Sequence, residues 1–297
     1  MSIPIKKIYV DTKKKTQDSF SNSRFKWELP ETISLPHNTI FYIDDICIPH
    51  SWYTIESNMN DRLYVQVSDN NANYLLRGNN CQIVMLTAGH YNLQTLAAEI
   101  NSKMNAAFYT NQIPAHFSTT ANHINNTITI TPQDASLLVK ILTDTDLVTG
   151  MADVNLYGWG GAWNGTAYNT SQPNDINDII GNAEGSSSFF SQASPFSTGY
   201  IDLQPIKNIY MYSPNLGTFK TYGPMGEVTI VKKIPVNAGD NMMIFDNVSS
   251  SSDYLDCSRQ TLKTIQFELK DVHGTLIPLH GAHVSFSLVF DKYRENE

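Results

Sequence analysis

The chain has 297 residues, a formal net charge of −8 and a sequence pI of about 5.4. This acidic balance argues against a general nucleic-acid coat protein. Charged residues make up only 16% of the chain, and Asn, Ser, Thr and Tyr are abundant, which is typical of a β-protein with many turns and not of a helical bundle.

Three cysteines, Cys47, Cys81 and Cys257, lie far apart in the sequence. An odd number without a close pair argues against a disulfide framework and against a zinc ribbon. The first ten residues, MSIPIKKIYV, lack the apolar core of a signal peptide, and no stretch approaches the length of a membrane span. We therefore expect a protein that is made and kept in a reducing compartment.

The first block of the chain reads as β-strands. Pro4 places the strand Ile3–Val10 at a sheet edge. The strand Thr39–Pro49 carries apolar residues on both parities, which predicts a central strand covered on two sides. Further strands are predicted at Phe25–Leu29, Leu63–Val67 and Gln82–Leu86.

The middle of the chain changes character. A helix is predicted after Asn92, a suitable N-cap, because apolar residues then recur at helical spacing: Leu93, Leu96, Ala97, Ile100 and Met104. Hairpin-like segments follow around Phe117 and at Ile124–Ile130, and then an apolar run at Leu137–Leu142. The irregular region Thr149–Thr198, interrupted by a short apolar turn that ends at Gly181, is too long for an ordinary loop and is either functional or flexible.

Strands resume in the last block, at Ile206–Tyr212, Glu227–Ile234 and Met242–Phe245. The final stretch, Thr261–Tyr293, predicts a closing pair of antiparallel strands with strict alternation. In its last strand Val284, Phe286, Leu288 and Phe290 lie on one parity, and Ser285 and Ser287 lie on the other.

These elements predict an all-β fold: an antiparallel jelly-roll β-sandwich with an inserted smaller domain that contains a helix, hairpins and a Gly/Ser/Asn-rich loop region. The expected division is residues 1–88 for the first half of the sandwich, 89–200 for an inserted, projecting domain, and 201–297 for the second half.

The sequence contains no nucleophile elbow, phosphate-binding loop, zinc-protease helix or dinucleotide fingerprint, so no catalytic, cofactor-binding or metal-ligating residues are assigned and an enzyme is not expected. Asp44 and Asp45 are adjacent on a strand and are expected to face opposite ways, which excludes a shared site. His273, His280 and His283 cluster in the last connection and are interpreted as polar loop residues, with an ion site as the alternative. His50 is interpreted as a packed residue at a strand end.

Two surface hypotheses remain. Four aromatic residues of the irregular region, Tyr157, Trp159, Trp163 and Tyr168, form either a sugar-stacking platform or the core of the inserted domain. Five lysines near the N-terminus, Lys6, Lys7, Lys13, Lys14 and Lys15, form either a contact for an anionic partner or a solvated tail.

With the strands placed, the chain resembles the penton, or minor capsid, proteins of virophages and of Polinton-like and adintovirus-like DNA viruses. The resembling stretches are spread in order along the chain: Phe41–Ile55, Leu63–Val65, Gly89–Asn101, Asp178–Gly181, Asn208–Ser213, Val231–Val236 and Phe267–Phe290. The glycine-rich region around Trp159 departs from any pattern that we can place.

The resemblance implies a jelly-roll protein of the virion, of which five copies close each fivefold capsid vertex as a homopentamer. The implied partners are a major capsid protein with a double jelly roll and, through the N-terminal lysines, genome DNA or another internal virion component. Assembly would take place in the host cytoplasm or a virus factory. The alternative is a carbohydrate-binding or host-attachment β-sandwich protein.

Overall fold

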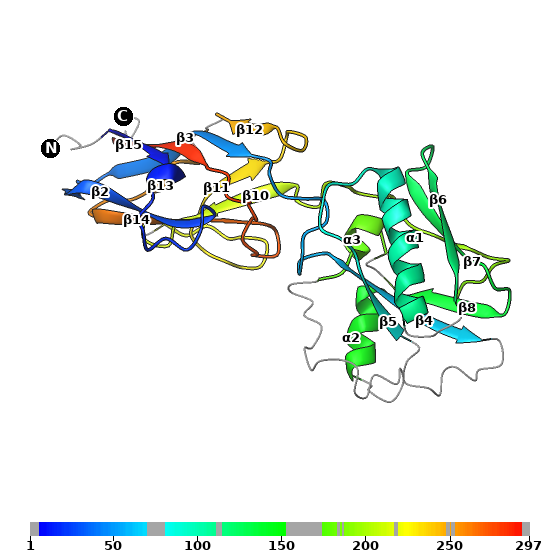
Figure 1. The fold of residues 1–297 in the computed structure, drawn as a ribbon. Coiled ribbons are helices and arrows are strands. Elements are labelled where there is room, and N and C mark those ends of the chain that lie inside the picture. The colour runs from blue at the N-terminus through cyan, green and yellow to red at the C-terminus, as the bar shows by residue number, and fades with distance from the viewer. Residues whose placement is uncertain are drawn as a thin grey trace. The chain divides into compact units, whose positions relative to one another are not determined.

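The computed structural model describes residues 6–69, 81–110, 115–152, 174–182, 185, 187–216, 219–247, 250 and 253–292. The chain divides into two compact units, one formed by Met1–Trp52 with Ile206–Glu297 and the other by Tyr53–Pro205. The first unit is a β-sandwich, and the second is inserted between two of its strands (Figure 1).

The sandwich consists of two antiparallel sheets. The first sheet has the order β1-β15-β3-β12, with the short β13 paired to β3, and the second has the order β11-β10-β14-β2. Along the chain the strands occupy the two sheets in the order of a jelly roll: β1, β3, β12, β13 and β15 lie in the first sheet, and β2, β10, β11 and β14 lie in the second. The bounds are β1 Lys7–Asp11, β2 Arg24–Ser34, β3 Thr39–Pro49, β10 Asn208–Tyr212, β11 Ile230–Pro235, β12 Met243–Asp246, β13 Leu255–Asp256, β14 Thr261–Lys270 and β15 Ser285–Lys292, with a 3-10 helix at Thr12–Lys14. The predicted fold class is confirmed.

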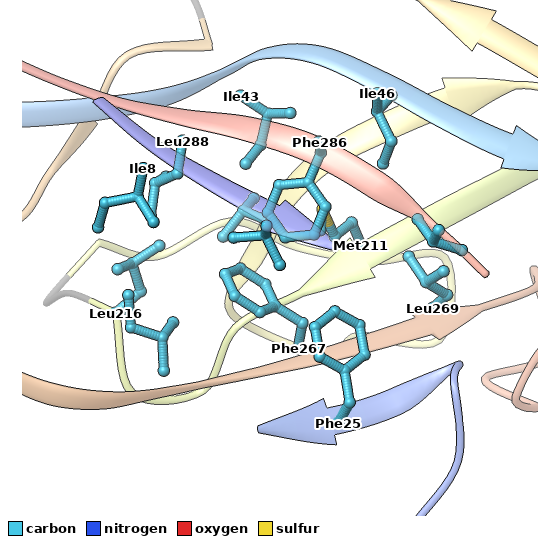
Figure 2. Close-up of a cluster of buried hydrophobic side chains, with 14 of the residues drawn as sticks. Ile8, Phe25, Ile43, Ile46, Met211, Leu216, Phe267, Leu269, Phe286 and Leu288 are labelled. Atoms are coloured by element: carbon cyan, nitrogen blue, oxygen red, sulfur yellow. The ribbon is translucent and has the colours of Figure 1, made fainter. Parts of the chain in front are cut away.

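The sandwich core lies between the two sheets. Phe286 of β15 packs against Phe267 of β14, with ring centroids 4.9 Å apart, and against Phe25 of β2 at 6.4 Å. Figure 2 shows these rings pointing toward one another from opposite sheets, among aliphatic side chains such as Ile43 and Leu269. The predicted parity of the last strand is confirmed, since Val284, Phe286, Leu288 and Phe290 are all buried in this core.

The inserted unit has its own core. The helix α1 (Leu93–Thr110) packs its predicted apolar side chains into a buried cluster with β4 (Arg62–Asp69) and β5 (Cys81–Met85). The predicted N-cap is confirmed, because Asn92 Oδ1 accepts a hydrogen bond of 2.9 Å from Thr95 N. The remaining elements are β6 Phe117–Asn122, β7 Thr127–Pro132, β8 Leu137–Ile141, α2 Asp144–Ala152, α3 Asn177–Ile180 and β9 Phe196–Ser197.

The unit boundaries differ from the expected ones. The strands β4 and β5 were expected in the sandwich, but they form the sheet β5-β4-β8 inside the inserted unit. The insertion therefore spans Tyr53–Pro205 and not 89–200, and it is at least as long as the sandwich. Alternation along a strand predicts which side chains are buried but not which neighbour covers them, and this is why the assignment failed.

We predict that the sandwich folds without the insertion, because each unit has a separate buried core. A variant that joins Trp52 to Ile206 through a short glycine-serine linker should unfold cooperatively in urea and keep the near-ultraviolet circular dichroism of packed aromatic residues. Loss of a cooperative transition would show that the sandwich depends on the insertion for its folding.

The carboxylate of Asp146 is buried in the inserted unit and accepts several hydrogen bonds. Asp146 Oδ2 accepts hydrogen bonds from Thr143 N at 3.1 Å, from Thr143 Oγ1 at 3.0 Å and from Ser187 N at 3.0 Å, and also from Ser187 Oγ. Its Oδ1 accepts from Lys140 Nζ at 3.2 Å. Burial alone would raise the pKa of Asp146, but the hydrogen bonds from Ser187, Thr143 and Lys140 outweigh it and hold the pKa below its ordinary value.

Because the folded-state pKa of Asp146 is depressed, its ionised form contributes stability above the unfolded-state pKa of about 3.9, and this contribution is lost as the pH falls through the folded-state value. Asp146→Asn should therefore lower the free energy of unfolding on the order of 1–3 kcal/mol at pH 7. The difference from wild type should shrink below about pH 4. Urea unfolding at a series of pH values measures it, and a difference that does not change with pH would contradict the assignment.

Candidate assembly surface

The outward face of the β1-β15-β3-β12 sheet carries a β-bulge. Ser287 pairs with Asp45 and Leu288 pairs with Ile43, so Asp44 is the extra residue of β3. The bulge shifts the alternation of β3 by one residue. Phe41 and Ile43 before it, and Ile46 and Ile48 after it, all enter the same core in consequence.

The bulge also brings Asp44 and Asp45 to one site. Lys7 Nζ lies 2.6 Å from Asp44 Oδ2 and 3.8 Å from Asp45 Oδ2, and Ser287 Oγ lies 2.9 Å from Asp45 Oδ2. The expectation that the two aspartates face opposite ways is therefore wrong, because simple alternation does not hold across a bulge. The hydrogen bond to Asp44 raises the pKa of Lys7. In the described part of the chain, no group of three or more His, Cys, Asp or Glu side chains is arranged to hold a metal ion.

The N-terminal lysines do not form a separate arm from Lys6 onward. Lys7 lies in β1, which pairs with β15 at the edge of the sheet, as predicted for an edge strand. Lys13 and Lys14 belong to the 3-10 helix and are exposed, and Lys15 Nζ donates to Asn22 Oδ1 at 2.7 Å. The five lysines thus share one edge of the sandwich, but Lys7 is already paired with the bulge aspartates.

The histidines take local roles. His50 is buried at the end of β3 and stacks on Trp52 at 4.2 Å, with Nδ1 2.9 Å from Ala238 O, as predicted for a packed strand-end residue. His283 Nδ1 lies 3.3 Å from Thr12 Oγ1. His273 belongs to a turn in which its backbone N donates to Asp271 Oδ1, and His280 is exposed. The aromatic residues Tyr157, Trp159, Trp163 and Tyr168 lie outside the described residues.

Two of the cysteines are free thiols in the structure. Cys257 is buried, and burial raises the pKa of its thiol to about 12. Cys47 is partly exposed on the outward face, and burial raises the pKa of its thiol as well. A raised pKa keeps each thiol protonated at neutral pH. Neither thiol is therefore activated as a nucleophile, because the reactive form is the thiolate.

Sequence reasoning missed the apolar side chains exposed beside the opposite edge of the same sheet. Met242, Met243 and Phe245, in and next to β12, expose 64%, 57% and 51% of their surfaces. The available signal was an apolar run on both parities in a short segment flanked by Asp240 and Asp246. Large apolar side chains that are exposed next to one another, unlike scattered ones, are typical of interaction surfaces.

The topology defines a class of protein: a single jelly roll that carries a long insertion. A comparison with solved structures finds the crystal structure of the mavirus penton protein, at a TM-score of 0.53 and 10% sequence identity, covering 97% of this chain and 99% of that chain. The chain thus has a penton-like fold. Comparisons of the sequence with family models and with curated proteins find no match.

The described residues include no helix that is both long enough and apolar enough to cross a membrane.

Proposed function

We propose that this protein is a capsid vertex protein, of which five copies close each fivefold vertex of an icosahedral virion. The observation that carries the proposal is the extent of the structural likeness. It covers nearly the whole of both chains, so it includes the insertion as well as the sandwich. Many jelly rolls share a sandwich, so a likeness that extends over the insertion as well is a more specific resemblance.

The proposed partners follow from this role. They are further copies of the chain in a homopentamer and a double-jelly-roll major capsid protein around it, in the virion. Assembly is proposed in the host cytoplasm or a virus factory. The lysines of the sandwich edge, of which Lys6, Lys13 and Lys14 are exposed, are the proposed contact for an anionic partner.

The proposal is tested by the oligomeric state and by the position in particles. Native mass spectrometry of the purified chain should show a pentamer of a 33.3 kDa protomer. If the purified chain is monomeric, we examine particles formed by co-expression with the major capsid protein from the same genome instead. Electron cryomicroscopy should then show this chain at the fivefold vertices. Particles with closed vertices that lack the chain would refute the proposal.

A further inference from the structure

A pocket of about 590 Å³ lies at the end of the sandwich where β3 begins. It is formed by the turn between β2 and β3 and by residues 254–259, which include β13. Its volume is within the range of small-molecule binding sites. The side chains that line it include His37, Asn38, Ile40, Tyr254, Asp256 and Arg259.

Hydrogen bonds tie these two segments together. Arg259 N donates to Pro36 O at 3.3 Å. Cys257 N donates to Thr39 O at 3.0 Å, and Ser258 Oγ accepts from Thr39 N at 3.1 Å. The walls of the pocket are therefore fixed before a ligand arrives, and this lowers the entropy cost of binding.

Two residues of the lining have a left-handed backbone, since Asn38 and Arg259 both have a φ of 59°. Residues other than glycine rarely adopt this region, and asparagine tolerates it better than arginine does. Glycine would fit the turn with less strain than Arg259, so the turn itself does not require an arginine. Backbone strain of this kind is concentrated at functional sites.

Several polar groups of the pocket have no partner in the part of the chain that the structure describes. The guanidinium group of Arg259 and the imidazole of His37 are exposed and form no hydrogen bond or ion pair there. Asp256 Oδ1 accepts from Ser258 N at 2.9 Å, and its Oδ2 accepts no hydrogen bond from a described residue. The pocket therefore offers both donors and acceptors to a ligand.

An aromatic ring lies beside these polar groups. Tyr254 is 41% exposed, and its ring centroid lies 4.9 Å from the ring centroid of Tyr42. The contact with Tyr42 restricts the orientation of the Tyr254 ring. The exposed part of this ring is a flat apolar surface on which a ligand can pack.

We propose that this pocket binds a neutral sugar residue of a glycan, with the sugar ring against Tyr254 and its hydroxyl groups on Arg259 and Asp256. A sugar has C–H groups on the faces of its ring, and its hydroxyls both donate and accept hydrogen bonds. A site for an anion would offer donors without the Asp256 carboxylate, and a site for a cation would lack Arg259. This inference adds a binding role to the proposed vertex role and does not depend on it.

The test is ligand-observed saturation-transfer NMR on the purified full chain. The probes are the methyl glycosides of glucose, galactose, mannose and N-acetylglucosamine, each at millimolar concentration. At least one of them should receive saturation from the wild-type protein, most strongly at the protons of one ring face, because that face packs on Tyr254. Titration of that glycoside then gives its dissociation constant.

Two variants connect the binding to the pocket. Tyr254→Leu removes the aromatic ring, and Arg259→Gly removes the guanidinium group; each should weaken binding about tenfold or more, since a lost hydrogen bond to a charged group costs at least that much. Glycine adopts the left-handed turn without strain, so Arg259→Gly should unfold in urea at the same concentration as the wild type or at a higher one. Weaker binding by this variant is therefore not a result of unfolding. The matched control is Tyr222→Ala, which removes a tyrosine that is 77% exposed outside the pocket and should bind like the wild type.

Three results would overturn the inference. The first is a wild-type protein that binds none of the glycosides. The second is binding that both pocket variants retain at wild-type strength, because the sugar would then bind elsewhere on the chain. The third is a pocket that takes inorganic phosphate, followed by phosphorus NMR, or tetramethylammonium in place of the glycosides. None of these results bears on the vertex role, which is tested by the oligomeric state and by the position in particles.

Discussion

Phe286→Ala should lower the free energy of unfolding of the sandwich by about 3–5 kcal/mol, the range for a large aromatic side chain deleted from a core. Phe286 is only 2% exposed, and its ring contacts Phe267 and Phe25 of the opposite sheet. Alanine would leave a cavity between the two sheets. The sheets could not move together to close it, because the other core side chains hold them at their spacing. Urea unfolding followed by tryptophan fluorescence in a Trp159→Phe/Trp163→Phe background measures this, since the two remaining tryptophans, Trp27 and Trp52, lie in the sandwich unit.

The matched control is Ser285→Ala, one residue earlier in the same strand. Ser285 is partly exposed on the outward parity, so its loss should cost far less. Ser287 is a poor control, because it is buried and hydrogen bonded to Asp45. Equal losses for Phe286→Ala and Ser285→Ala would contradict the register of β15.

Lys232→Ala is the second change with a large expected effect. Lys232 Nζ lies between the sheets, 3.5 Å from Asp246 Oδ2 of β12 and 3.3 Å from Ile43 O of β3, and its side chain is 4% exposed. The substitution removes one partner of a buried ion pair. The Asp246 carboxylate then stays buried after the loss of the Lys232 ammonium group. The expected loss of stability is about 3–5 kcal/mol, measured by the same fluorescence-detected unfolding.

The control for this prediction replaces both partners. Lys232→Met with Asp246→Leu leaves no buried charge and retains most of the volume, so the double variant should be much more stable than Lys232→Ala and close to the wild type. If the double variant is as unstable as Lys232→Ala, the loss comes from packing and not from the ion pair.

Part of the candidate surface was predictable. The five N-terminal lysines are visible in the sequence, and Pro4 within the predicted strand Ile3–Val10 indicated the edge strand that carries Lys7. The exposed side chains Met242, Met243 and Phe245 were not recognised as a surface, because only the pairing of β12 with β3 places them at a sheet edge. β1 and β12 lie at opposite ends of the same sheet because β15 pairs with both β1 and β3.

The sequence by itself determined the elements with a strong period: the helix from Leu93, the central strand Thr39–Pro49, and the closing pair with Phe286 in the core. Periodicity is a local property, so these predictions need no knowledge of distant residues. Only the tertiary structure decided that β4 and β5 belong to the insertion, that Asp44 and Asp45 meet Lys7, and that Lys232 enters the core to pair with Asp246. The physical reason is that strand partners, bulges and buried ion pairs are non-local contacts, formed between segments that are far apart in the sequence and show no pattern along it.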